Sequence, residues 1–279
     1  MKQILQIYKR EISLYKTISS EGEKTYWQTL SQALDLWDTA PLRAIHDFLV
    51  LSESGDARTQ TGLGLSYYLA SELEFHKPAA VYWLSRAAGN DFTLAHCAIG
   101  TCYLSGIGIE VDLSAAERWF KLAAERDYAP GQFMLGRYLY QQFEDARHKE
   151  LAIEWFQKAA EQGYAPAQYI LGLCCMDGIG TLKAPEKGIA WVKLAAEQGD
   201  IAAIRKMIEL HKLTGDIEDQ VYWIRQGAAT GDTELQYQLA LNFEYGTGVE
   251  QSYRQAAIWY RKAVERLQPA DGKPSSTSK

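Results

Sequence analysis

The sequence has no apolar run long enough to cross a membrane, and it opens without the features of a secretion signal. A transmembrane helix needs about 18 or more consecutive apolar residues, and no stretch of the 279 residues approaches that length. The N-terminal segment MKQILQIYKREISLYK mixes charged and apolar residues, and it lacks the apolar core of about 7–15 residues that a signal peptide carries. We therefore expect a cytoplasmic protein, or a periplasmic one if a signal has been removed.

Cysteine is scarce, with four residues in the chain, and none of the four is placed to form a disulfide. Cys97 and Cys102 are expected on one helix, where a spacing of five residues separates them by about 140° around the axis. Cys102 and Cys174 occupy equivalent positions two repeats apart, too far for a disulfide at about 8–10 Å between neighbouring helices. Cys175 follows Cys174 directly and points to another face. We expect four reduced thiols in a reducing compartment.

An excess of positive charge is also missing. The chain carries 29 Lys and Arg against 35 Asp and Glu, which gives a net charge of −6 and a sequence pI near 5.5. Proteins that bind nucleic acid cluster Lys and Arg to neutralise phosphates. The charge balance therefore argues against a nucleic-acid partner.

Motifs that carry chemistry are absent as well. No glycine-rich loop is followed by Gly-Lys-Ser/Thr, and no G-x-S-x-G sequence occurs, so phosphate-loop and nucleophile-elbow chemistry is not indicated. The five histidines form no His-x-x-x-His pair and no cluster with the cysteines of the kind that binds zinc. We expect a non-enzymatic protein without catalytic, cofactor-binding or metal-binding residues.

What the sequence does have is a repeat. Six of the eight tryptophans recur at steps of 36, 36, 36, 32 and 36 residues, at Trp83, Trp119, Trp155, Trp191, Trp223 and Trp259. Two small residues stand four and five positions after each Trp, as at Ala159 and Ala160. The first five repeats place a turn residue eight positions after the Trp, at Asp91, Asp127, Gly163, Gly199 and Gly231. A fixed period of this length is the signature of a repeat architecture.

A second block of residues precedes each Trp. In every repeat except the fifth, which is four residues shorter after its first helix, an apolar residue and a small residue stand 20 and 19 positions before the Trp, as at Leu171 and Gly172. Three repeats begin a Gly-x-Gly 13 positions before it. Apolar residues recur at helical spacing in both blocks. Each repeat is therefore predicted to be a helix A, a glycine-containing turn, a helix B and a second turn. Such pairs bury their apolar stripes only by stacking, which makes a solenoid.

The pattern A-x-x-x-L-G-x-x-Y-x-x-G-x-G, followed by a Trp and an Ala-Ala pair, resembles the Sel-1-like repeat (SLR) family, relatives of the tetratricopeptide repeats. The resemblance implies an all-α, right-handed α/α solenoid with repeats of about 36 residues. It covers six repeats over residues 57–266. Residues 1–56 are predicted to form capping helices and a degenerate repeat, and residues 267–279 a disordered polar tail.

One face of helix A is predicted to bind a partner. The positions 22, 18 and 15 residues before each Trp, which we call the groove stripe, lie on the side of helix A away from its packing positions. The resemblance implies that this side lines the concave groove. Aromatic, Met and Arg residues, which are enriched at interfaces, mark the predicted partner-binding residues: Phe133, Arg137, Tyr140, Tyr169, Leu173, Met176 and Tyr237.

Three functions remain open from the sequence. The first is a scaffold or adaptor that binds a protein or peptide in the groove, as the resemblance implies. The second is a bacterial immunity or regulatory protein that inhibits one cognate effector enzyme. The third, an enzyme subunit, is the least favoured because no motif supports it.

Overall fold

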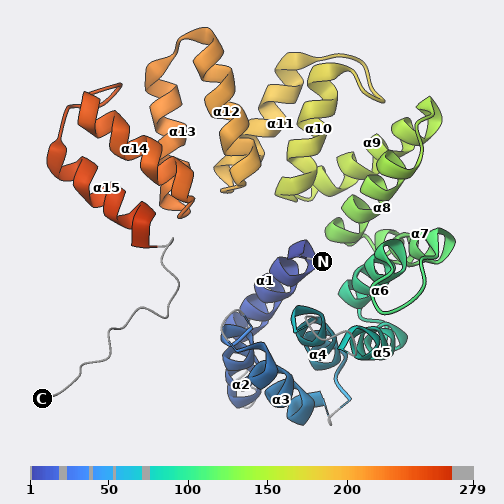
Figure 1. The fold of residues 1–279 in the computed structure, drawn as a ribbon. Helices are drawn as coiled ribbons and strands as arrows, with labels where there is room; N and C mark the ends of the chain where they lie inside the picture. Colours follow the sequence, from blue (N-terminus) through green and yellow to red (C-terminus); the bar gives the residue numbers. More distant parts are fainter. Residues whose placement is uncertain (1, 19–23, 38–39, 53–54, 71–75, 266–279) are drawn as a thin grey trace, which may run out of the picture. The chain divides into compact units, whose positions relative to one another are not determined.

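The computed structural model describes residues 2–18, 24–37, 40–52, 55–70 and 76–265. Within these ranges every regular element is an α-helix, and no strand occurs. This confirms the predicted all-α solenoid of helix pairs (Figure 1). The helices are α1 (Lys2–Ile18), α2 (Lys24–Asp35), α3 (Pro41–Ser52), α4 (Ala57–Leu69), α5 (His76–Gly89), α6 (Thr93–Ser105), α7 (Leu113–Glu125), α8 (Ala129–Gln142), α9 (Ala146–Glu161), α10 (Ala165–Asp177), α11 (Pro185–Glu197), α12 (Ile201–Thr214), α13 (Ile217–Ala229), α14 (Thr233–Tyr245) and α15 (Tyr253–Glu265).

From α4 onward the helices alternate as helix A and helix B of the predicted repeats. Even-numbered helices are helix A and odd-numbered helices are helix B, so that α10 and α11, for example, form the fourth pair. The chain divides into two compact units, residues 1–159 and 160–279, called unit 1 and unit 2. The predicted tail, residues 267–279, lies outside the described residues.

The helix ends are set by the residues that the sequence places there. Asp200 caps α12, and its carboxylate accepts the backbone N–H of Ala203 at 2.9 Å, the usual role of an N-cap aspartate. At the other end, Gly178 closes α10 in the left-handed conformation. The turn column after helix B is left-handed even where it is not glycine, with φ of 61° at Asp91 and 55° at Asp127. Asp tolerates this conformation better than most residues, which explains why Asp alternates with Gly in the column.

The core lies between helix A and helix B of each pair. The residue directly after the Trp is buried in the central repeats, as at Phe120, Phe156 and Val192. The small residue of the Leu-Gly column makes room for it: a Cβ added at Gly136 would lie 2.8 Å from the Phe156 ring. Close packing of this kind is why both columns recur in step.

Five of the six tryptophans that mark the repeat are partly exposed, and Trp223 is buried. Trp155 is partly exposed, whereas its neighbour Phe156 has no exposed surface. A cation three residues later in the helix covers the Trp ring: Lys158 Nζ lies 4.1 Å from the ring centroid of Trp155. The ring therefore has one face on the protein and one under a cation, an arrangement that favours a large amphipathic side chain.

A further column, 23 residues before the Trp, holds a buried polar side chain that the sequence analysis did not single out. Gln168 Nε2 donates to the backbone oxygen of Ala160 at 3.1 Å, and Gln236 Nε2 donates to that of Ala228 at 3.3 Å. In both repeats the acceptor is a carbonyl near the end of the preceding helix B, and it also accepts the N–H of the turn glycine that follows, Gly163 or Gly231. The column therefore ties each helix A to the repeat before it.

Candidate protein-binding surfaces

In unit 1 the predicted partner-binding residues are engaged within the protein. Phe133 is only 3% exposed, and its ring centroid lies 5.6 Å from that of Phe156 in the core. A buried ring cannot contact a partner, so Phe133 is a core residue and not a surface anchor. Arg137 is exposed, but its Nη1 donates to Gln3 Oε1 of α1 at 3.0 Å.

Tyr140 is the third predicted residue of unit 1, and it is partly buried. Its ring packs against Phe156 on one side, with centroids 6.3 Å apart. Lys149 Nζ lies 3.9 Å from the ring centroid and also donates to the Tyr140 backbone oxygen. The ring is thus held between helix B and a cation, which leaves a limited edge for any partner.

In unit 2 the predicted residues keep exposed surface. Tyr237 on α14 is 49% exposed, and its ring centroid lies 5.4 Å from that of Tyr260. Tyr169 on α10 is partly buried against the core of unit 2. Burial, together with the nearby carboxylates of Asp200 and Glu209, raises the pKa of Tyr169, so its hydroxyl stays protonated and able to donate.

Leu173 and Met176 complete the predicted set in unit 2, and both are partly buried. Met176 packs toward helix B: a Cβ added at Gly188 of α11 would lie 2.5 Å from Met176 Cγ. The next repeat is four residues shorter between helix A and its Trp, so its groove stripe is counted four residues closer to Trp223. It consists of Arg205, Glu209 and Lys212, which are charged and exposed. Arg205 forms an ion pair with Asp232 at 3.0 Å. The groove stripe of unit 2 therefore offers apolar and aromatic residues on α10 and α14, with charged residues on α12 between them in sequence.

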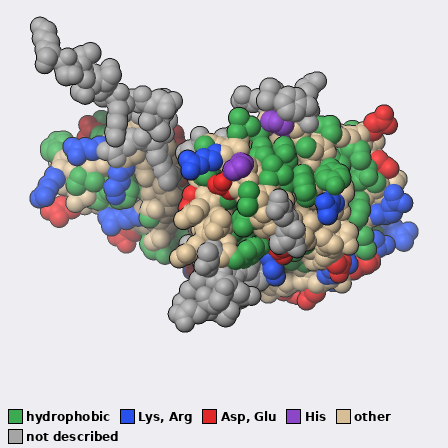
Figure 2. Space-filling model, turned by 90° about the horizontal axis from the view of Figure 1, so that it is seen from below, with side chains coloured by type: hydrophobic (Ala, Val, Ile, Leu, Met, Phe, Trp, Pro, Cys, Tyr) green, Lys and Arg blue, Asp and Glu red, His purple; other side chains and the backbone are tan. Residues whose placement is uncertain are grey.

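A second surface candidate lies on α3 and α5 of unit 1. Figure 2 views the face that points down in Figure 1, and hydrophobic side chains gather over much of the area seen there. Among the exposed apolar residues of unit 1 are Leu42 and Val50 of α3, 63% and 59% exposed, and Tyr82 of α5. Val50 and Trp83 also line a common shallow pocket. Exposed apolar patches of this kind often mark interaction sites.

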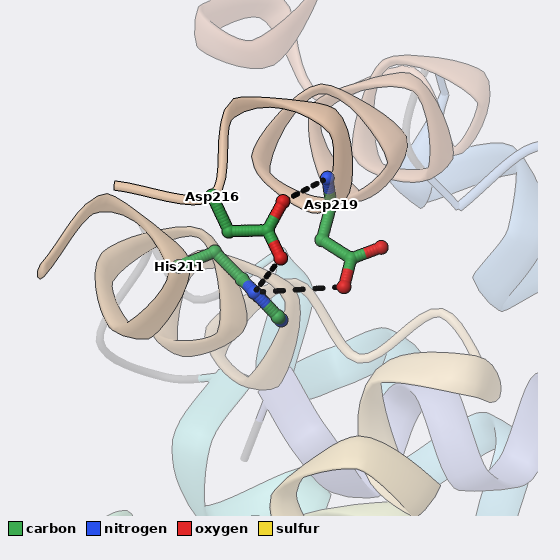
Figure 3. A group of neighbouring side chains, drawn as sticks. All are labelled: His211, Asp216 and Asp219. Atoms are coloured by element: carbon green, nitrogen blue, oxygen red, sulfur yellow. Dashed lines mark hydrogen bonds and ion pairs between the residues drawn. The ribbon is translucent and has the colours of Figure 1, made fainter. Parts of the chain in front are cut away.

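One group of side chains has the composition of a metal site (Figure 3). His211 lies in the last turn of α12, and its Nδ1 is 3.8 Å from Asp216 Oδ2 and 3.7 Å from Asp219 Oδ2. The sequence contains no metal-binding motif that would predict this cluster, because its three residues come together only where α12 ends and α13 begins. Asp216 already has a structural role, since its carboxylate caps α13 by accepting the Asp219 N–H at 3.1 Å. Helix capping and ion pairing account for the cluster without a metal.

The cysteines are all free and buried, in agreement with the sequence analysis. Burial raises the pKa of the Cys102 thiol to about 12 and that of Cys97 further above its usual range. A thiol that stays protonated is a poor nucleophile. These residues therefore behave as small core side chains.

Comparison with known proteins identifies the family. The Sel1 repeat model matches residues 76–92, 93–128, 129–164, 165–200 and 233–266, which is more than half of the chain. The protein therefore belongs to the Sel1 repeat family, as the sequence pattern predicts. Proteins of this family generally mediate protein–protein interaction, and the fold is typically non-catalytic. No match was found among curated proteins.

Solved structures of similar fold come from several bacteria. A protective antigen of uropathogenic Escherichia coli strains, displaying an SLR fold, is 27% identical, with a TM-score of 0.58 over 95% of this chain and 62% of that chain. This chain thus spans less than two thirds of that antigen. A Sel1 repeat protein from Oxalobacter formigenes is 22% identical, with a TM-score of 0.63 over 85% of this chain and 99% of that chain.

An immunity protein from Pseudomonas aeruginosa is 18% identical, with a TM-score of 0.48 over 67% of this chain and 74% of that chain. A similarity this low gives no information about the function of the present protein. Among the described residues of the present protein, no helix is long and apolar enough to cross a membrane.

Proposed function

We propose that this protein is a non-enzymatic interaction scaffold that binds a protein or peptide through the groove stripe of unit 2. The observation that carries the proposal is a difference within one repeat column. At 22 residues before the Trp, Cys97 of unit 1 is fully buried, whereas Tyr237 of unit 2 is 49% exposed. The family relationship supports an interaction role in general, and the exposed column points to where the contact is made.

The composition of this surface favours a protein partner. Tyr, Met and Arg are enriched at interface cores, and truncation of a well-placed aromatic anchor typically costs about 2 kcal/mol or more of binding free energy. The binding residues we propose are Tyr169, Leu173, Met176 and Tyr237. Phe133, Arg137 and Tyr140, which the sequence also predicted, are left out because their side chains are engaged within unit 1.

The test uses two tyrosines of unit 2 that are matched in exposure. Tyr237 is 49% exposed on helix A, and Tyr222 is 48% exposed on helix B. Full-length protein serves as bait for an affinity pull-down from the native cell, and the affinity of the captured partner is then measured for Tyr237→Ala, Tyr169→Ala and Tyr222→Ala. We expect each groove substitution to weaken binding by about thirtyfold, as 2 kcal/mol implies, with Tyr222→Ala unchanged.

Two other results would contradict the proposal. If Val50→Asp abolishes binding while Tyr169→Ala and Tyr237→Ala leave it intact, the interface is the apolar patch of α3 and α5. If Tyr222→Ala weakens binding as much as Tyr237→Ala does, the contact lies on helix B. The identity of the captured protein then decides between an adaptor and an inhibitor of one cognate enzyme.

A further inference from the structure

The groove stripe of unit 1 is partly covered by the protein's own N-terminal helix. Figure 1 shows α1 beside α4, α6 and α8, the three A helices of unit 1, and α1 packs directly on α6. At 22 residues before the Trp, the stripe residues Thr61, Cys97 and Phe133 are all buried. The same column is partly or largely exposed in unit 2, so burial is not a property of the column itself.

Polar contacts fix α1 at several points along this face. Near the start of α1, Gln3 accepts from Arg137 of α8 at 3.0 Å. In the middle of the helix, the Tyr8 hydroxyl donates to the Arg58 backbone oxygen of α4 at 2.6 Å. Two of the three A helices, α4 and α8, are therefore joined to α1 by hydrogen bonds, and the third, α6, packs against it.

The second half of α1 is held by Glu11. The Tyr128 hydroxyl, at the N-cap of α8, donates to Glu11 Oε1. Glu11 also lies close enough to Cys97 of α6 for its charge to raise the pKa of that thiol. Gln3 of α1 lines one pocket together with Thr101, Leu104 and Arg137 of the groove stripe, so α1 lies against the stripe itself.

The buried side chains of α1 describe the kind of helix that this face accepts. Ile4, Tyr8 and Ile12, spaced by four residues, are fully or almost fully buried, whereas Gln6 and Leu14 are exposed. Leu5 and Ile7 are buried as well, and the Tyr8 ring also stacks on Trp37, with centroids 5.5 Å apart. An amphipathic helix with apolar anchors at this spacing, laid along a groove, is a recurrent mode of peptide recognition. The pattern adds one carboxylate, Glu11, directed at a tyrosine hydroxyl.

We infer that the groove stripe of unit 1 is a receptor for an amphipathic helix, that α1 is its built-in occupant, and that an external helix of the same chemistry binds there by displacing α1. This site is separate from the surface proposed on unit 2 and does not depend on it. A tethered occupant acts at an effective concentration of about 1 mM. An external helix therefore competes poorly until α1 is released.

The experiment measures binding of a fluorescein-labelled peptide of residues 2–18 to the full-length protein by fluorescence anisotropy. Two variants are compared with the wild type. Ile4→Asp with Ile12→Asp places two charges on the buried face of α1, and Gln6→Asp with Leu14→Asp places two charges on its exposed face. We expect the first variant to bind the peptide at least about tenfold more tightly than the wild type, since the tethered competitor is lost. The second variant should match the wild type.

Specificity is tested on the receptor side. Adding Tyr128→Phe to the first variant removes the hydroxyl that pairs with Glu11 and should weaken peptide binding, while Tyr237→Ala on unit 2 should leave it unchanged. A first variant that is folded by circular dichroism but does not bind the peptide would overturn the inference. So would loss of folding in that variant, because α1 would then be an obligatory part of the core.

Hydrogen exchange on the wild-type protein tests independently whether α1 can be displaced. If α1 is a displaceable occupant, its amides exchange through an opening that leaves α4, α6 and α8 protected. Exchange of α1 amides only together with those of α6 would contradict displacement. This measurement needs no substitution and involves neither the peptide nor the surface on unit 2.

Discussion

Tyr128 and Glu11 are 117 residues apart in the sequence, and the Tyr128 hydroxyl donates a hydrogen bond to the Glu11 carboxylate. The bond joins the N-cap of α8 to the N-terminal helix α1. It places an ionisable group of α1 at the contact between α1 and α8. The stability of that contact should therefore depend on pH.

Burial raises the pKa of Glu11 above its ordinary value of 4.5, and the Tyr128 hydrogen bond and the charge of Arg58 only partly oppose this. A carboxyl whose pKa is higher in the folded state binds its proton more tightly there. Its contribution to stability is full below about 4.5 and is lost as the pH rises through the raised pKa. We expect Glu11→Gln, which stays neutral, to gain stability relative to the wild type as the pH rises through this window.

The measurement is the free energy of unfolding of the wild type and Glu11→Gln against pH. Tyr128→Phe serves as a second variant: it removes a hydrogen bond that favours the charged carboxylate, so it should raise the pKa of Glu11 further. Identical pH profiles for the wild type and Glu11→Gln would show that Glu11 is not buried between α1 and α8.

Substitutions in α9 test the assignment of the core. Phe156 has no exposed surface and Trp155 is partly exposed. Truncating a buried Phe to Ala typically costs about 3–5 kcal/mol. We expect that loss for Phe156→Ala and a smaller one for Trp155→Ala, as measured by denaturant unfolding. A larger loss of stability for Trp155→Ala than for Phe156→Ala would show that Trp155 is the more deeply packed of the two residues.

The Gly-x-Gly turn is tested at its second glycine. Gly108 has φ of +69°, and an added Cβ would lie 2.2 Å from the Lys77 backbone oxygen. Gly108→Ala should therefore cost more than about 1 kcal/mol, since Ala is strained at positive φ. Gly89, the last residue of α5, has open space around an added Cβ. Gly89→Ala should be neutral or stabilising by up to about 1 kcal/mol, and thermal unfolding of the pair distinguishes the two effects.

The number of free thiols and their rate of reaction in the folded protein can both be measured. Denatured, non-reduced protein should release four equivalents in a thiol titration, one for each free cysteine. The folded protein should react much more slowly, because burial raises the pKa of Cys102 to about 12 and the thiolate is the reactive form. A count of two or zero would mean that disulfides form, and fast reaction of the folded protein would mean that the helices carrying these residues open readily.

The fold could be predicted from the sequence because its determining contacts lie within one repeat. Gly136 meets Phe156, and Gly172 meets Val192, each about twenty residues along the chain. The same pair of columns recurs in the first four repeats, so the contact can be recognised from the period of the sequence. The polar column of Gln168 and Gln236 is equally periodic, and it could have been found by the same comparison of repeats.

The binding surface could be predicted only in part. Phase within the repeat places Phe133 and Tyr237 on the same side of helix A, and it assigns both to the groove stripe. In the structure Phe133 is 3% exposed and Tyr237 is 49% exposed. Both residues obey the same helical geometry, so the difference comes from what packs against each of them.

The sequence by itself determined the helix pairs, their turns and the packing columns, because short-range periodic contacts leave a signal at a fixed spacing. Only the tertiary structure decided which part of the groove stripe is free. The helix that covers unit 1 is α1, whose contacts with Arg58, Tyr128 and Arg137 span from 50 to 134 residues of chain. Each of these contacts occurs once and has no counterpart in another repeat, so no period marks it. Burial by a non-repeating helix is a property of the folded chain, and it cannot be predicted from the spacing of residues within the repeats.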